Sequence, residues 1–247
     1  MRKILIVTGG SRGIGAATAR LAAAEGYDVC ISYLQNQEAA KRVVSEIQKV
    51  GRTAIAVRTN VAIETEVVRL FNEVDKIGCV TALVNNVGIL EPQTRVESID
   101  AARLARVFST NVIGSFLCAR EAIKRMSTRR GGSGGSIVNV SSGASKSGSP
   151  NEYVDYAASK GAIDTMTLGL AKEVAKEGIR VNAVRPGFIH TDIHASGGEP
   201  NRIERIKSAI PLQRGGQAEE AAQAILWLLS DRASFTTGSF IDVTGGA

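Results

Sequence analysis

The chain carries its apolar residues in seven short runs, separated by longer stretches that repeat with the period of a helix. The runs lie at 3–8, 28–33, 53–58, 81–86, 136–141, 179–184 and 239–244. Near-continuous apolar strands that alternate with helices are typical of a parallel sheet covered on both faces. The pattern predicts an α/β fold, a doubly wound parallel sheet of about seven strands in three layers. In such a sheet, ligands bind at the carboxyl ends of the strands.

Length and low-complexity content both favour a single domain. The 247 residues suit one large α/β domain and are few for two. One stretch, 129–136, reads RRGGSGGS and has the composition of an interdomain linker. Because strands and helices alternate on both sides of it, a tight surface loop is the favoured interpretation. We expect one domain over residues 1–247.

Composition indicates which kinds of partner the protein binds and in which compartment it is expected. The formal net charge is +6, but the basic residues are spread along the chain and aromatic residues make up only 4%. Nucleic-acid binding is therefore not expected, because base-stacking platforms need aromatic side chains. Cys30, Cys79 and Cys118 lack metal-ligand spacing and are expected to be free thiols of a reducing compartment. With no apolar run of membrane-spanning length and no signal-peptide pattern, we expect a cytoplasmic protein without membrane contact.

The first turn reads TGGSRGIG over residues 8–15, directly after a predicted strand and at the start of a predicted helix. Gly9 allows a tight turn, Gly13 allows close approach of a pyrophosphate, and Gly15 allows the helix to pack near the strand. Backbone N–H groups and the positive end of the helix dipole favour phosphates there. The turn therefore predicts a dinucleotide site rather than an ordinary glycine turn.

The end of the second strand bears on which dinucleotide binds. An NAD site usually places a carboxylate there for the ribose hydroxyls, whereas this chain has Ser32, Tyr33 and Leu34. A missing carboxylate removes repulsion against a 2′-phosphate, and Arg12 in the glycine turn offers a matching positive charge. NADP(H) is the favoured cofactor, and NAD(H) stays possible.

A tyrosine and a lysine four residues apart supply the candidate chemistry. Tyr156 and Lys160 share one helix face, whereas Tyr153 has Ala157 at the corresponding place. A neighbouring cation lowers the pKa of a phenol, which makes it a better proton donor to a carbonyl oxygen. Taken alone, Tyr156 is equally consistent with an ordinary tyrosine on a helix face.

The motifs together resemble one family. TGGSRGIG, NNVG (85–88), Asn111 in STNVIGSF, VSS (140–142), YAASK (156–160) and RPGFIHT (185–191) stand in the order typical of the short-chain dehydrogenase/reductases. The resemblance covers the chain from the first strand to the last and implies a single-domain Rossmann fold. Within the family, the chain resembles bacterial ketoacyl reductases and sugar dehydrogenases.

The resemblance implies four catalytic residues. Tyr156 would be the general acid/base, and Lys160 would bind the nicotinamide ribose and lower the pKa of Tyr156. Ser142 would hydrogen-bond the substrate oxygen, and Asn111 would bind a water that connects Lys160 to solvent.

The resemblance also implies a set of cofactor contacts along the sheet edge. Those near the pyrophosphate and adenosine would be Gly9, Ser11, Arg12, Gly13, Ile14, Tyr33, Asn60, Val61, Asn86 and Gly88. Those near the nicotinamide would be Tyr156, Lys160, Pro186, Gly187, Ile189 and Thr191.

The chain departs from the family pattern at three places. Val87 stands where alanine is commoner, and Asn60 stands where aspartate is frequent, which weakens the expected adenine contact. Ser142 precedes Tyr156 by 14 residues, one more than the commonest spacing. Ser141 is therefore a second, less favoured, occupant of the serine position.

The segment at about 190–212 is expected to be a substrate lid, with Gly197 and Gly198 as a hinge. His190, His194 and Arg202 are candidates for substrate contact there, or else solvated loop residues. No carboxylate or cysteine set completes a metal site with the two histidines, so no metal is expected.

These observations predict an enzyme that interconverts a small carbonyl compound and its alcohol with NADP(H). One alternative is an NAD-linked sugar or polyol dehydrogenase. A less favoured alternative is a non-catalytic NADP-binding sensor or structural subunit. The resemblance also implies a homo-oligomer, a tetramer.

Overall fold

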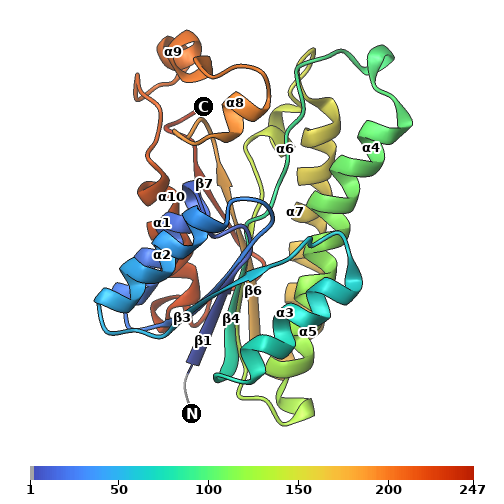
Figure 1. Ribbon diagram of the computed structural model, residues 1–247. Coiled ribbons are helices and arrows are strands. Elements are labelled where there is room, and N and C mark those ends of the chain that lie inside the picture. The colour runs from blue at the N-terminus through green and yellow to red at the C-terminus, as the bar shows by residue number, and fades with distance from the viewer. Residues whose placement is uncertain (1–2) are drawn as a thin grey trace.

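The computed structural model describes residues 3–247 and contains one seven-stranded sheet (Figure 1). Its strands are β1 (Lys3–Val7), β2 (Asp28–Tyr33), β3 (Ala54–Arg58), β4 (Cys79–Asn85), β5 (Gly135–Val140), β6 (Ile179–Pro186) and β7 (Phe240–Val243). Every neighbouring pair is parallel, and the order is β3-β2-β1-β4-β5-β6-β7. The chain builds outward from β1 to one edge and then from β4 to the other, so the predicted doubly wound sheet is confirmed. The direction reverses between β1 and β4, where ligands of such sheets bind.

Helices cover both faces of the sheet (Figure 1). One layer contains α1 (Gly13–Ala24), α2 (Gln37–Lys49) and α10 (Ala218–Leu229). The other contains α3 (Glu64–Asp75), α4 (Ala101–Phe108), α5 (Gly114–Met126) and α7 (Val154–Val174). Shorter helical segments are η1 (Val96–Ser98), η2 (Ser109–Ile113), η3 (Thr128–Arg130), α6 (Ala144–Ser147), η4 (Ala175–Glu177), α8 (Ile193–Ser196), α9 (Arg202–Ile206), η5 (Lys207–Ala209) and η6 (Asp231–Ala233).

The sheet separates two hydrophobic cores, and β1 contributes to both. Leu5 and Val7 pack with the α1, α2 and α10 layer, whereas Ile4 and Ile6 pack with the α3, α5 and α7 layer. All four side chains are completely buried. Successive side chains of a strand point to opposite faces, so a strand with both faces covered must be apolar at every position. This explains why the runs in the sequence are continuous rather than alternating.

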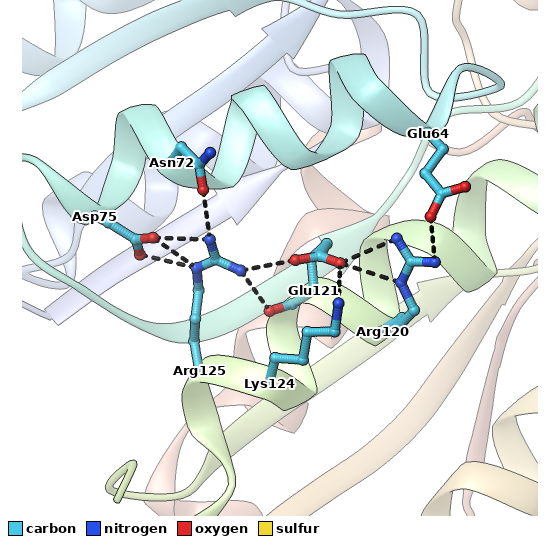
Figure 2. Close-up of polar contacts among 7 residues, drawn as sticks. All are labelled: Glu64, Asn72, Asp75, Arg120, Glu121, Lys124 and Arg125. Carbon is cyan, nitrogen blue, oxygen red and sulfur yellow. Dashed lines mark hydrogen bonds and ion pairs between the residues drawn. The ribbon is translucent and has the colours of Figure 1, made fainter. Parts of the chain in front are cut away.

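The α3 and α5 helices are joined by a polar network around Glu121 (Figure 2). The Glu121 carboxylate accepts hydrogen bonds from Arg120, Lys124 and Arg125. Arg125 continues to Asp75 on α3, at 2.7 Å. Burial alone raises the pKa of Glu121, but the hydrogen bonds from the three cations outweigh it and leave the pKa below its usual value. The network fixes the outer surface of this layer.

The glycine-rich stretch is a loop of one domain, not a linker. After η3 the chain turns through 131–134, and β5 already begins at Gly135. At Gly134, which has φ +76°, a Cβ would lie 2.4 Å from the carbonyl oxygen of Gly178. Only glycine fits this close approach between two backbones.

Two further sequence expectations concern cysteines and membranes. Cys30 and Cys118 are free and buried, and burial raises the pKa of Cys118 to about 12. Among residues 3–247, no helix has the length and apolarity needed to cross a bilayer.

Candidate active site

The glycine turn connects β1 to α1 at the carboxyl edge of the sheet. The Gly9 and Gly10 N–H groups donate to the hydroxyl and carbonyl oxygens of Ser32 on β2, at 3.1 and 2.9 Å. Gly9 has φ +65° and Gly13 has φ +53°, both in the left-handed region that favours glycine. Arg12, at the start of α1, gives the helix no side-chain cap. The first N–H groups of the helix are therefore available to an anion.

Asn86, just after β4, holds this turn in place. Its Nδ2 donates to the carbonyl oxygens of Thr8 and Gly9, at 2.9 and 3.2 Å. A Cβ at Gly15 would lie 2.5 Å from the same Nδ2. The third glycine of the motif thus makes room for the Asn86 side chain and for the backbone of Gly9 and Gly10. Of the other residues predicted on this turn, Ser11 is half-buried, and the half-buried Ile14 side chain packs on the core.

The end of β2 presents cations and no carboxylate. Tyr33 pairs with Arg58 in the register of β2 and β3, and the Arg58 Nε donates to the carbonyl oxygen of Leu34 at 3.1 Å. Arg12 is largely exposed and lies 3.7 Å from Asp192, a weak surface pair. Sequence reasoning missed Arg58. Its place as the last residue of the strand next to β2 is the signal that would have found it.

Asn60 and Val61 shape the turn after β3. The Asn60 side chain accepts a hydrogen bond from the Ala62 N–H at 3.1 Å, and its own N–H donates to Glu66 at 2.8 Å. Val61 is buried against Gly114, where a Cβ would approach the Val61 side chain to 2.6 Å. The Asn60 side-chain oxygen is thus engaged in the turn, and Val61 packs into the core.

Tyr156 and Lys160 lie one turn apart near the start of α7, with the Lys160 Nζ 5.6 Å from the centre of the Tyr156 ring. The Nζ donates to the carbonyl oxygen of Val140 at the end of β5, at 2.8 Å. Lys160 is buried, and burial lowers its pKa to about 8. A side chain that titrates so close to neutrality can exchange protons with its surroundings.

The expected lowering of the Tyr156 pKa by Lys160 does not appear in this structure. Burial raises the pKa of Tyr156 above its ordinary value. The groups that oppose this rise are the Ser142 hydroxyl, by a hydrogen bond, and the Arg202 guanidinium, by its charge. The reason is that the phenol lies in a desolvated pocket while the Lys160 ammonium is directed to Val140.

Ser142, not Ser141, shares a cavity with Tyr156. Ser142 lines the cavity and accepts a hydrogen bond from the Ala144 N–H at 3.1 Å. Ser141 is buried beneath it and donates to the carbonyl oxygen of Lys160 at 3.2 Å. Ser142, rather than Ser141, is therefore the serine that shares the cavity with Tyr156.

Asn111 lies in a π-helical turn, η2, between α4 and α5. It is completely buried; its Nδ2 donates to the Ile89 carbonyl and the Ser159 hydroxyl, and its Oδ1 accepts from the Ile89 N–H at 2.8 Å. Single π turns inside helices often mark functional sites, because they redirect one side chain. Here the turn directs Asn111 towards the Lys160 helix.

Gly88 lies beside the same two residues. A Cβ at this position would be 3.2 Å from the Lys160 Nζ and 3.7 Å from the Asn111 Oδ1. The structure thus places Gly88 beside Lys160 and Asn111.

A cavity of about 250 Å³ opens in front of Tyr156 and Ser142. Pro186 and Gly187, at the end of β6, form one wall. Thr191 reaches back from the following loop, so that a Cβ at Gly13 would lie 3.1 Å from it. Ile189, also predicted as a contact, is buried, and its carbonyl oxygen contacts the Nε2 of His194 at 2.9 Å.

The segment predicted as a lid, about 190–212, contains α8 and α9 and lies above the carboxyl edge of the sheet (Figure 1). His194 and Arg202 are buried and line the cavity. His190 is exposed, does not line the cavity and lies near Gly215. Of the three residues considered for substrate contact, the fold brings two to the cavity.

These residues fit a nicotinamide dinucleotide. The glycine turn leaves backbone N–H groups at a helix N-terminus, where phosphates bind. The same sheet edge continues past Asn86 and Gly88 to the cavity with Tyr156 and Ser142. A side chain at Gly9 or Gly13 would crowd the turn, because a Cβ there would lie 3.1 Å from Val87 or from Thr191.

Comparison with known proteins identifies the family. The family model described as enoyl-(acyl carrier protein) reductase matches residues 9–247. The structure superposes with a TM-score of 0.91 on a short-chain dehydrogenase from Burkholderia cenocepacia, solved in complex with NADP, at 30% identity over 99% of this chain and 97% of that one. The chain belongs to the short-chain dehydrogenase/reductase family.

Two curated relatives of the short-chain dehydrogenase/reductase family match almost end to end. An oxidoreductase from Escherichia coli K12, named "uncharacterized oxidoreductase YgfF", is 62% identical over 98% of this chain and 99% of its own length. A 3-oxoacyl-[acyl-carrier-protein] reductase from Synechocystis is 40% identical over 99% of this chain and 96% of its own. The predicted fold, family and enzyme class, an oxidoreductase acting on CH–OH and C=O groups with NAD(P), are confirmed.

Proposed function

We propose that the protein is an NADP(H)-dependent reductase of a small carbonyl compound, with Tyr156 as the general acid. The main support for this proposal is that Tyr156 and Ser142 line one cavity at the carboxyl edge of the sheet. Lys160 and Asn111 lie behind these two side chains. Bound NADPH supplies the hydride. The alcohol product would be oxidised by the same residues acting in reverse.

The chain's own residues handle the proton and the oxygen. The Ser142 hydroxyl donates a hydrogen bond to the carbonyl oxygen of the substrate, and Tyr156 transfers its proton to that oxygen as negative charge develops. The raised pKa of Tyr156 keeps the phenol protonated until then. Lys160 binds the cofactor ribose, and Asn111 holds a water that reprotonates Lys160 from solvent. Desolvation of the cavity strengthens each of these polar interactions.

NADP(H) is proposed over NAD(H) because the adenosine end of the site is cationic. Arg58 lies at the end of β2, Arg12 belongs to the adjoining glycine turn, and Ser32, Tyr33 and Leu34 provide no carboxylate. A 2′-phosphate would pair with these guanidinium groups. We expect NADPH to bind at least about tenfold more tightly than NADH, since one charge-assisted contact contributes about 1.5–3 kcal/mol. Dissociation constants of the two cofactors, by fluorescence titration, measure the difference.

The experiment that tests the function is NADPH oxidation with a panel of ketones, ketoacyl thioesters, quinones and ketoses, using wild type and Tyr156→Phe. Removing the phenolic proton donor is expected to lower kcat by roughly 10²–10⁴-fold, the usual range for a general acid. The NADPH dissociation constant should stay within about twofold, since the ring is retained. Unchanged turnover in Tyr156→Phe would sink the mechanism. Tight NADPH binding with no reduced substrate would favour a non-catalytic binding module.

The proposal extends to compartment and assembly. Cys30 and Cys118 are free, buried thiols, which is the usual state of cysteine in a reducing cytoplasm. Large apolar side chains on the α5–α7 layer, Phe116 and Leu168, are 48% and 43% exposed in the single chain. We propose a cytoplasmic homotetramer in which such side chains are covered by neighbouring subunits.

A further inference from the structure

The lid places a buried arginine against the cavity in which the proposed chemistry occurs. Arg202 begins α9, and its side chain is only 10% exposed. Its guanidinium lies over the rings of Tyr153 and Phe188, at 4.7 and 5.3 Å from their centres. All three of these residues line the cavity together with Ser142 and Tyr156. A planar cation fixed between two aromatic rings has a defined orientation towards anything that enters.

Arg202 is held by carboxylates but is not fully satisfied by them. Its Nη2 donates to Glu152, which directly precedes the cavity residue Tyr153. The Nε has no hydrogen-bond partner within residues 3–247, and the Glu199 carboxylate lies 3.8 Å from it. This Nε is itself inaccessible, so a ligand reaches the guanidinium only where it lines the cavity.

The charge of Arg202 is already balanced. Arg205 pairs with the same two carboxylates, at 3.2 Å from Glu152 and 2.9 Å from Glu199. Two guanidinium groups and two carboxylates therefore form a cluster with no net charge. A ligand carboxylate would add an unbalanced negative charge beside this cluster, whereas a neutral oxygen would accept a hydrogen bond from the guanidinium, where it lines the cavity, without that cost.

The size of the cavity limits what reaches this donor. Its volume is about 250 Å³, compared with roughly 150 Å³ for an apolar cavity that holds benzene. The rest of the lining is mostly apolar, with Leu90, Pro186 and Ile193 among its members. Such a cavity admits a short substrate, or the reactive end of a long one, and Arg202 is the arginine that lines it.

We infer that Arg202 is a specificity-determining residue that donates a hydrogen bond to a second, neutral oxygen of the substrate. This inference rests on the proposed reductase function and names the substrate class. The preferred substrates carry a hydroxyl, ester or thioester oxygen a few atoms from the carbonyl that is reduced. Simple ketones without a second oxygen make no hydrogen bond to Arg202 and are poorer substrates.

The test compares ketones of equal size with and without the second oxygen. Methyl acetoacetate is matched with 2-heptanone, and 4-hydroxy-2-butanone with 2-pentanone. In Arg202→Gln and Arg202→Lys, we expect kcat/KM for the oxygen-bearing ketones to fall about 10- to 100-fold, the effect of losing one hydrogen bond to a charged group. Values for 2-heptanone and 2-pentanone should change by less than about threefold. Arg202→Lys keeps a positive charge that can pair with Glu152. It therefore controls for the loss of the ion pair that holds the 190–212 segment in place.

Arg205→Gln is the matched control. Arg205 belongs to the same charge cluster but is 52% exposed and does not line the cavity. Its loss should affect all four ketones equally, and by little. Equal losses of kcat/KM for the oxygen-bearing and plain ketones in the Arg202 variants would overturn the inference. Arg202 would then only hold the 190–212 segment in place. A preference for levulinate, which carries a carboxylate, over methyl acetoacetate would overturn the assignment of a neutral oxygen.

A binding measurement separates this inference from the proposed function. The same ketone pairs are titrated calorimetrically into Tyr156→Phe protein loaded with NADPH, with and without Arg202→Gln. Binding does not need turnover, so a preference for methyl acetoacetate that disappears with Arg202→Gln supports the inference even if wild type reduces no ketone. Equal affinity for both members of each pair would overturn it even if wild type is an active reductase.

Discussion

Gly88 keeps open the space in which the Lys160 ammonium lies. A Cβ there would approach the Lys160 Nζ to 3.2 Å, closer than almost all real contacts, and the ammonium is fixed by its bond to Val140. In Gly88→Ala we expect the ammonium to shift and kcat to fall about tenfold, because a displacement of a few tenths of an ångström at a positioned group is costly. Steady-state kinetics measure the loss.

Gly169→Ala provides the control for Gly88→Ala. Gly169 lies in α7, the helix that carries Lys160, and a Cβ there would meet nothing within 4 Å. Alanine favours helix over glycine by about 1 kcal/mol, so stability should rise slightly while kcat stays unchanged. Equal activity of the two alanine variants would show that Lys160 tolerates the crowding.

The pKa of Lys160, about 8, predicts a pH dependence of cofactor binding. A ribose that hydrogen-bonds the ammonium favours its charged form, so binding is strongest below pH 8, where the charge is already present. Above pH 8, binding must also take up a proton, and NADPH affinity should fall by up to tenfold per pH unit. Titrations at pH 7 and 9 test this. A slope that persists in Lys160→Met would assign it to another group.

Single residues also show where sequence reasoning reached its limit. The sequence left both Ser141 and Ser142 open, because spacing along the chain does not say on which side of a strand end a side chain emerges. The direction of the Tyr156 pKa was expected wrongly for a related reason. Helical spacing places Lys160 near Tyr156. The desolvation of the phenol, however, depends on every segment that packs around it, and the sequence does not show which segments those are.

Between elements, a buried ion pair fixes the start of α7. Asp155, next to Tyr156 on α7, accepts from the Nε and Nη2 of Arg103 on α4, at 2.7 and 3.2 Å. Arg103 also donates to the Pro92 carbonyl, which ties in the loop after β4. Both side chains are nearly inaccessible. The pair thus sets where α7, and with it Tyr156, meets α4.

Asp155→Asn would leave the Arg103 charge buried without a counter-ion. We expect unfolding free energy to fall by about 3–5 kcal/mol, the cost of breaking a buried pair from one side. Urea unfolding measures it. Replacing both members, as in Arg103→Met with Asp155→Leu, should recover most of the loss, since no buried charge remains. A double variant as unstable as Asp155→Asn would contradict the role of the unpaired charge.

The π-helical turn at Ser109–Ile113 is an element that the sequence did not predict. Its residues continue the pattern of the helices on either side, so local periodicity gives no sign of an extra residue. The turn matters for contacts between distant segments. It lets Asn111 hydrogen-bond to Ile89 and Ser159, which lie 22 and 48 residues away in the chain.

At the scale of the molecule, exposed apolar side chains on α5 and α7 indicate where subunits would associate. If Phe116 is covered by a second subunit, a charge there opposes association. We expect light scattering to give a tetramer for wild type and a smaller species for Phe116→Glu. As a comparison, Glu121→Gln weakens the network of Figure 2 and should lower stability by about 1–3 kcal/mol without changing the mass in solution. A wild-type monomer would refute the tetramer.

The sequence alone determined the sheet, its covering helices, the glycine turn and the Tyr156–Lys160 spacing. Each of these depends on residues close together in the chain, where strand and helix periods and turn geometry act. Only the tertiary structure decided that Ser142 faces the cavity, that Arg58 reaches the end of β2, and that Arg202 and His194 rather than His190 line the cavity. These outcomes depend on where segments from distant parts of the chain meet. Packing of the complete fold, and the desolvation that comes with it, fixes those meetings.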